Sequence, residues 1–146
     1  MDFLAGLRAS FSGLQAQRLR MQVIAANLAN ANATRTPEGG PYQPRLVVFA
    51  AVPQQSPFAA LLSDSVEANL SEVRVVDVVR DPSRVRLEYD PSHPDANAQG
   101  YVAYPDINLM QEMVDLLTAT RAYEANVTAI NAAKDMSLRA LQIGRV

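Results

Sequence analysis

The side chains that could perform acid–base or metal chemistry are few and widely spaced in this chain. His93 is the only histidine, and it lies in a turn sequence with no second histidine or cysteine to complete a metal site. Asp90, Asp95 and Asp106 flank turns, where aspartate binds nearby backbone N–H groups, and they lack the regular ligand spacing of a calcium loop. We therefore interpret His93 as a structural or solvent-exposed turn residue.

Nucleophilic and phosphate-binding patterns are equally weak. Ser10, Ser12 and Ser71 have no neighbouring base in the sequence, and a chain with no cysteine has neither a disulfide framework nor a thiolate nucleophile. The Pro-Glu-Gly-Gly-Pro-Tyr stretch at 37–42 is not followed by Lys-Ser/Thr, as a phosphate loop would be. The sequence therefore predicts no enzyme, no catalytic residue, no cofactor, no metal and no small-molecule substrate.

The composition is that of one folded domain without a strong electrostatic preference. The 146 residues are 49% hydrophobic, and 13 basic residues stand against 15 acidic ones, so neither nucleic acid nor an anionic membrane is an expected partner. No apolar run is long enough to span a membrane. Asp2 and the arginines from Arg8 onward argue against a cleaved secretory signal.

A long amphipathic helix is predicted for residues 3–31, and a second one, of about 35 residues, for 108–143. Asn108 is a suitable N-cap for the second helix, with Gln111 three residues later as in a capping box. Both segments show apolar residues at alternating spacings of three and four, close to a heptad repeat. The residues predicted to pack helices or subunits together are Leu4, Leu7, Phe11, Leu14, Met21, Leu28, Met113, Leu116, Tyr123, Val127, Ile130 and Leu141.

The middle of the chain is predicted to be a loop followed by a small β-rich region. Strands are expected at 46–52, 72–81, 84–90 and 100–105, with 53–71 left ambiguous. The Asp-Pro-Ser turn between the second and third of these strands predicts that they form a hairpin. The chain thus divides into an N-terminal helix (1–32), a loop and β-rich region (33–107) and a C-terminal helix (108–146), an α+β class.

The two helices can cover each other's apolar stripes if they pair as an antiparallel coiled coil. The spacing then predicts a register in which Leu14 faces Ile130, and it also brings Arg20 near Glu124. One helix pair buries only one stripe per helix, and the remaining faces are rich in alanine, which allows further helices to approach closely. This pattern indicates a structural or interaction protein.

Asparagine is concentrated where the first helix ends, although it is a mediocre helix former. Its amide can cap and terminate the helix, or it can bond to a neighbouring subunit, and the sequence leaves both interpretations open. The residues predicted to make polar contacts between subunits are Asn27, Asn30, Asn32, Glu124, Asn126 and Asn131.

Several blocks of this sequence resemble the bacterial flagellar axial proteins, which form rod and hook. The N-terminal block is Ser12-Gly13-Leu14 followed by Asn27-Leu28-Ala29-Asn30-Ala31-Asn32. The segments 34–42, 89–108 and 112–136 narrow the resemblance to the short proximal-rod class. The resemblance covers both ends and most of the middle of the chain.

The resemblance implies a structural subunit of the flagellar basal-body rod, located in the periplasm after export from the cytoplasm by the flagellar type III apparatus. Such subunits polymerise with copies of themselves and with other rod proteins into a helical tube that transmits torque and encloses the export channel. The terminal helices would form an inner layer and the β-rich middle an outer one. The alternatives are a second type of proximal-rod protein, a soluble coiled-coil adaptor or a membrane-surface protein.

Overall fold

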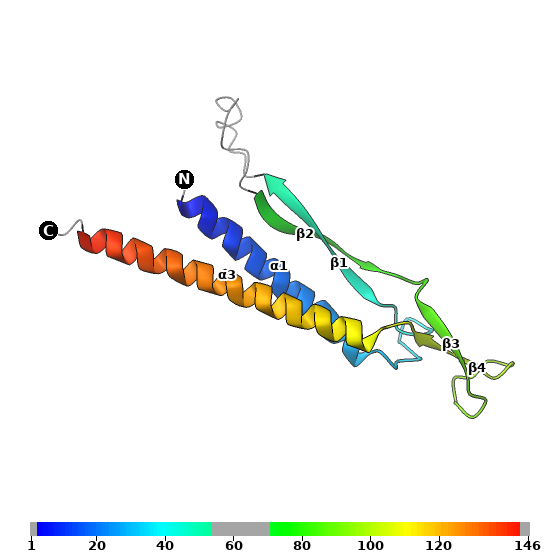
Figure 1. Ribbon diagram of the computed structural model, residues 1–146. Coiled ribbons are helices and arrows are strands. Elements are labelled where there is room, and N and C mark those ends of the chain that lie inside the picture. The colour runs from blue at the N-terminus through cyan, green and yellow to red at the C-terminus, as the bar shows by residue number, and fades with distance from the viewer. Residues whose placement is uncertain (1–2, 54–70, 144–146) are drawn as a thin grey trace. The chain divides into compact units, whose positions relative to one another are not determined.

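A computed structural model describes residues 3–53 and 71–143 of the chain. These residues form two long helices and four strands, which confirms the predicted α+β class (Figure 1). The ambiguous segment at 53–71 lies almost wholly outside the described residues. The elements are α1 (Phe3–Ala29), β1 (Arg45–Pro53), β2 (Ser71–Arg80), β3 (Val85–Tyr89), β4 (Tyr101–Pro105) and α3 (Leu109–Ile143).

The chain divides into two compact units that cut across the long elements. Unit 1 takes its described residues from 1–19, 49–76 and 119–146, and unit 2 consists of 20–48 and 77–118. Each unit therefore contains a part of both helices and a part of the β-rich middle, and each is described by itself below.

Helix α3 begins as its sequence predicts. The Asn108 carboxamide oxygen accepts hydrogen bonds from the backbone N–H of Met110 (3.1 Å) and of Gln111 (3.2 Å), which satisfies two of the free donors of the first turn. The Gln111 side chain completes no capping box, because its amide donates to Asp115 Oδ2 at 3.3 Å. The helix then continues for 35 residues.

The strands lie where the sequence places them, but one of the predicted pairings is wrong. β2 pairs with β1, and β3 pairs with β4, so β2 and β3 do not form the hairpin expected from the intervening turn. The turn itself is present, since Asp81 Oδ1 accepts from the Ser83 N–H at 3.0 Å. It connects two separate ribbons, because local turn chemistry does not determine which strand supplies the partner edge.

The β3–β4 hairpin is antiparallel, and its register places Leu87 opposite Ala103 and Tyr89 opposite Tyr101. The predicted long turn at 91–100 connects the two strands. Gly100, the last residue of that turn, has φ +81°, and a Cβ added there would lie 2.8 Å from a Tyr89 ring carbon. Glycine is therefore required at this position both by backbone conformation and by space.

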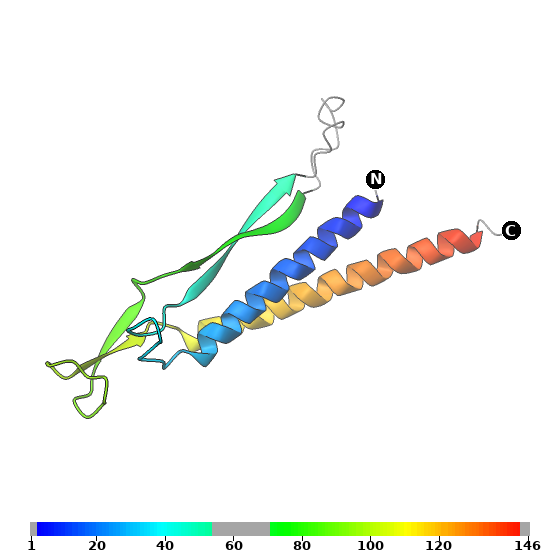
Figure 2. The same cartoon turned by 180° about the vertical axis from the view of Figure 1, so that it is seen from behind.

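Within unit 2, the end of α1 and the start of α3 run in opposite directions, since Arg20 contacts Asp115 and Asn27 contacts Glu112 (Figures 1 and 2). The helix register predicted from the apolar stripes is wrong by five residues. In unit 1, Gly13 lies against Asn126, whose amide nitrogen is 3.1 Å from the position of an added Cβ; the predicted register would place residue 131 there. In unit 2, Asn27 lies against Glu112, whereas the predicted register would place residue 117 there.

The ion pair of Arg20 also departs from the prediction. Its guanidinium contacts Asp115 at 3.2 Å, and the predicted partner was Glu124, nine residues later in the chain. Both side chains of the observed pair are about one-third exposed, so the pair contributes little to stability by itself.

Candidate assembly surface

The part of α3 that belongs to unit 2 exposes five large apolar side chains. Met110 is 68% exposed and Leu117 60% exposed, and the set consists of Leu109, Met110, Met113, Val114 and Leu117. We call these five residues the α3 apolar face. Large apolar side chains that gather on one exposed surface indicate a site of protein contact.

Helix α3 contacts α1 through smaller and more polar residues. Ala119 is fully buried, Asn126 faces Gly13, and Glu112 faces Asn27. Asn126 and Glu112 therefore lie against α1, while Leu109, Met110, Met113 and Leu117 are exposed. Sequence reasoning missed this seam because it assigned the contact to the largest apolar residues, although a heptad repeat of Glu112, Ala119, Asn126 and Ala133 is present in the sequence.

The predicted packing residues divide into two groups. Phe11, Met113 and Leu141 are exposed, at 53%, 44% and 66% respectively, and they do not pack between the helices of this chain. The side chain of Leu4 lies outside the described residues. The half-buried members are Leu7, Leu14, Met21, Leu28, Leu116, Tyr123, Val127 and Ile130. Packing of the exposed members against other subunits stays a prediction.

A second exposed apolar surface lies on the β3–β4 hairpin. Val85, Leu87 and Tyr89 alternate along β3 and so share one face of the hairpin, and all three are exposed. The Tyr89 ring packs edge-on against Tyr101, with ring centroids 5.3 Å apart. This face offers aromatic and aliphatic area to a partner in the same way as the α3 apolar face.

A polar node at Asn27 joins three segments within unit 2. The Asn27 side chain is 1% exposed. Its amide nitrogen donates to the Arg45 carbonyl oxygen at 2.9 Å, and its amide oxygen accepts from the Arg45 N–H at 3.0 Å and from the Tyr42 hydroxyl at 3.1 Å. Both carboxylate oxygens of Glu112 lie 3.5 Å from the same amide nitrogen. We call these four residues the Asn27 node.

Burial at the Asn27 node shifts two pKa values in the direction that favours neutral side chains. Desolvation raises the pKa of Glu112, and the nearby Asp115 carboxylate adds to the rise, while the hydrogen bond from Asn27 and the charges of Arg84 and Arg20 oppose it. Desolvation also raises the pKa of the Tyr42 hydroxyl. The Glu112 carboxylate is thus held at some cost next to a neutral amide.

The structure gives the other predicted polar residues a variety of environments. The amides of Asn30 and Asn126 donate within their own helices, to the Ala26 oxygen at 2.8 Å and to the Ala122 oxygen at 3.0 Å. The side chains of Asn32, Glu124 and Asn131 are exposed. Contact with other subunits stays a prediction for these residues.

The residues with possible chemistry have structural roles. His93 Nδ1 accepts a hydrogen bond from the Asp95 N–H at 3.1 Å, and its ring packs against Tyr104, which confirms the prediction of a turn histidine. Within residues 3–53 and 71–143, no group of three His, Cys, Asp or Glu side chains could hold a metal ion.

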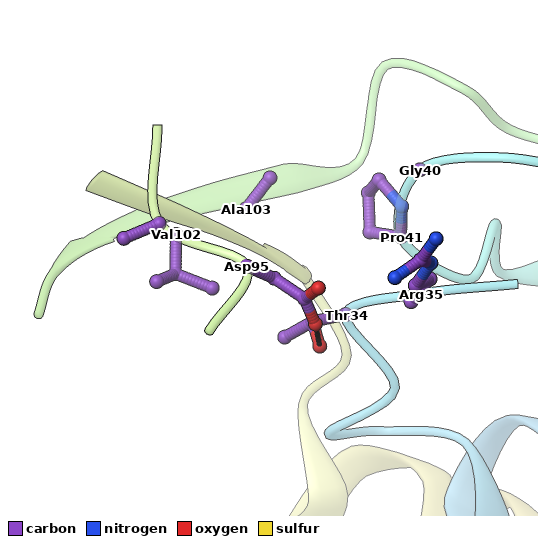
Figure 3. A pocket seen from close by; sticks show the side chains of 8 residues that line it. Thr34, Arg35, Gly40, Pro41, Asp95, Val102 and Ala103 are labelled. Atoms are coloured by element: carbon purple, nitrogen blue, oxygen red, sulfur yellow. Dashed lines mark hydrogen bonds between the residues drawn. The ribbon is translucent and has the colours of Figure 1, made fainter. Parts of the chain in front are cut away.

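One open pocket of about 310 Å³ lies between the loop at 34–41 and the end of the β3–β4 hairpin. Figure 3 shows the Asp95 carboxylate beside Thr34, whose hydroxyl donates to Asp95 Oδ2 at 2.8 Å. Arg35 is its other charged residue, and the rest of the lining is Gly40, Pro41, Ala96, Val102 and Ala103. The Thr34–Asp95 bond ties the loop to the hairpin turn, and the pocket contains no acid–base pair suited to catalysis.

Comparison with known proteins shows similarity over nearly the whole chain. A family model described as "Flagella basal body rod protein" matches residues 7–35, and "Flagellar basal body rod FlgEFG protein C-terminal" matches 98–143. The flagellar basal-body rod protein FlgC of Borreliella burgdorferi is 41% identical, with 98% of each chain covered. That of Bacillus subtilis is 42% identical, with 99% of this chain and 100% of the relative covered, and that of Escherichia coli is 38% identical, with 92% of each covered.

Neither α1 nor α3 combines the length and apolar character that crossing a membrane requires.

Proposed function

This chain belongs to the flagellar basal-body rod protein FlgC family, and we propose that it polymerises into a helical tube through the outward apolar side chains of its terminal helices. It is a structural subunit of the proximal rod, not an enzyme, and it assembles with other rod proteins in the basal body. In the proposed tube, the subunits transmit motor torque and enclose the export channel.

The observation that carries this proposal is the α3 apolar face. Burying one such side chain contributes about 1.5–3 kcal/mol, and five neighbouring ones leave a large favourable term unused in a single chain. A polymer recovers that term because the helices of neighbouring subunits cover the face. The partly polar contact between α1 and α3 supports the same conclusion, since it leaves Met110, Met113 and Leu117 of α3 exposed.

We propose further that α1 and α3 form an antiparallel coiled coil in an inner layer and that residues 33–107 form an outer layer. Gly13, which lies against Asn126 of α3, favours this arrangement because a residue without a Cβ allows a close approach of helix backbones. The free chain is proposed to reach the rod through the flagellar type III export apparatus, as the family resemblance implies. The polar contacts predicted for Asn32, Glu124 and Asn131 would then lie between subunits.

The proposal is tested by placing a charge on the α3 apolar face. Leu117→Asp buries a carboxylate at the proposed subunit contact, so we expect loss of swimming and of rod assembly in cells whose only copy is the variant. Motility in soft agar and the recovery of intact basal bodies measure the effect. The secondary structure of the purified variant should be unchanged, because Leu117 is 60% exposed in the single chain.

The matched control is Thr118→Asp, one residue along the same helix. Thr118 is exposed, and its hydroxyl donates to the Val114 oxygen of its own helix, so this variant adds the same charge outside the α3 apolar face. We expect it to swim at close to the normal rate. Normal swimming by Leu117→Asp, or equal loss in both variants, would contradict the proposed contact.

A further inference from the structure

We propose that Asn27 is the residue that fixes the register of the two terminal helices, by joining the end of α1, the start of β1 and the start of α3 in a single node. The inference concerns the fold of one subunit and does not depend on how subunits pack in a rod. It also revises the predicted role of Asn27, which was a contact to another subunit.

The Asn27 amide pairs with the backbone of Arg45. Asn27 donates to the Arg45 carbonyl oxygen and accepts from the Arg45 N–H, at 2.9 and 3.0 Å. The side chain thus pairs with both backbone groups of one residue, as a neighbouring β-strand would. Arg45 is the first residue of β1, so the amide substitutes for a strand partner where the strand begins.

The amide has no capacity left for another chain. An asparagine side chain offers two donors and two acceptor lone pairs. Arg45 takes one donor and one lone pair, the Tyr42 hydroxyl takes the second lone pair, and the Glu112 carboxylate faces the second donor at 3.5 Å. Because Asn27 is only 1% exposed, its amide has no accessible donor or acceptor for another subunit.

Asn27 also has a defined position on the seam. Gly13 and Asn27 are two heptads apart on α1, and their partners Asn126 and Glu112 are two heptads apart on α3. By sequence spacing, Asn27 therefore lies on the same heptad repeat of α1 as Gly13, and Glu112 lies on the same repeat of α3 as Asn126. A single buried polar residue on such a repeat specifies register, because any slip leaves its polar groups without partners.

A slip would disrupt more than the helices. A slip by one heptad would place Ala119 of α3, or Pro105 before the start of α3, opposite the Asn27 amide, while Arg45 still required its partner. Because the same amide bonds β1 and faces α3, the helix register and the start of the β region are set together. An aspartate at position 27 cannot donate these hydrogen bonds, and a leucine can neither donate nor accept them, so neither residue would reproduce the node.

The register is measurable because the chain has no native cysteine. Gly13→Cys combined with Asn126→Cys should form a disulfide readily in the full-length purified chain, since an added Cβ at Gly13 lies 3.5 Å from the Asn126 carboxamide carbon. Gly13→Cys with Ala119→Cys, or with Ala133→Cys, reports a slip by one heptad in either direction. We expect the first pair to form its disulfide about tenfold faster than either slipped pair.

The test places Asn27→Asp in each of these double-cysteine backgrounds. Loss of the donor and repulsion from Glu112 should reduce the preference for the first pair from about tenfold to less than about threefold. Asn30→Asp is the matched control, because the Asn30 amide donates to Ala26 of its own helix, and it should keep the full preference. A preference that survives Asn27→Asp, or that is absent from the starting chain, overturns the proposal.

A second variant keeps the test decisive if Asn27→Asp does not fold. Tyr42→Phe removes only the hydroxyl that donates to Asn27 and retains the ring. It should remain helical by circular dichroism and lower the preference for the native pair partially, by about threefold. An unchanged preference in folded Tyr42→Phe, together with loss of folding in Asn27→Asp, would assign Asn27 to stability alone and refute its role in register.

Discussion

The close approach of α1 to α3 at Gly13 leads to a prediction that contrasts two glycines of the same helix. Gly→Ala inside a helix gains about 1 kcal/mol of stability from helix propensity. At Gly6 nothing lies within 4 Å of an added Cβ, whereas at Gly13 the Cβ would lie 3.1 Å from the Asn126 amide nitrogen. The same substitution should therefore give different results at the two positions.

The expected magnitude follows from what Asn126 must give up. Its amide nitrogen also donates to the Ala122 oxygen at 3.0 Å, so moving it aside by a few tenths of an ångström weakens that hydrogen bond, which contributes about 0.5–1.5 kcal/mol. Gly6→Ala should gain up to about 1 kcal/mol, and Gly13→Ala should be close to neutral. For a chain of this size, the difference corresponds to about 4 °C in Tm.

The assay is thermal and urea unfolding of the two variants, with circular dichroism as the probe and a fixed protein concentration. Asn126→Ala combined with Gly13→Ala should restore the missing gain, because it removes the side chain that the new Cβ meets. If Gly13→Ala alone stabilises the chain as much as Gly6→Ala does, the helices do not approach closely at this position and the reasoning is refuted.

Two further predictions concern ionisable groups. The folded-state pKa of Glu112 is raised above its ordinary value of 4.5, so its contribution to stability is fully present below about that pH and is lost as the pH rises through the folded-state pKa. Glu112→Gln should therefore be more stable than the starting chain at pH 7. Unfolding measured from pH 4 to pH 8 should show this difference in stability shrinking in acid, whereas a constant difference would contradict the shift. In the two Asp-Pro-Ser turns, the serine hydroxyl and N–H lower the pKa of Asp81 and of Asp90, so Ser92→Ala should raise the pKa of Asp90 towards its ordinary value while the intact Ser83 keeps that of Asp81 low. Carboxyl NMR titration measures both values in one sample, and no rise at Asp90 would show that the hydroxyl is not responsible.

Local sequence signals predicted much of the fold. Asn108 marks the start of α3 because an N-cap is a short-range interaction, and the helical period of 109–143 persists over many turns. The four strands were likewise recognisable from their own composition. The α+β class followed from such local patterns, and the absence of a catalytic site followed from the lack of a second histidine or any cysteine to act with His93.

Long-range relations were not predictable in the same way. The pairing of β2 with β1 depends on a strand that ends at Pro53, well before β2 begins at Ser71, and the Asp81 turn is compatible with either partner. The helix register was wrong because large apolar residues were paired, while the actual seam contains Gly13, Asn126 and Glu112. The burial of Asn27 was hidden for the same reason, since its four hydrogen-bonding positions are satisfied by Arg45, Tyr42 and Glu112, which are distant in sequence.

The outward placement of leucine and methionine on α3 has a consequence for how the stability of this subunit must be expressed. Any association that covers Met110 and Leu117 binds the folded chain and not the unfolded one, so it shifts the folding equilibrium by mass action. The unfolding midpoint of the purified protein should then rise with its concentration. Folding and association are two parts of one equilibrium in such a chain, and a free energy of unfolding has meaning only at a stated protein concentration.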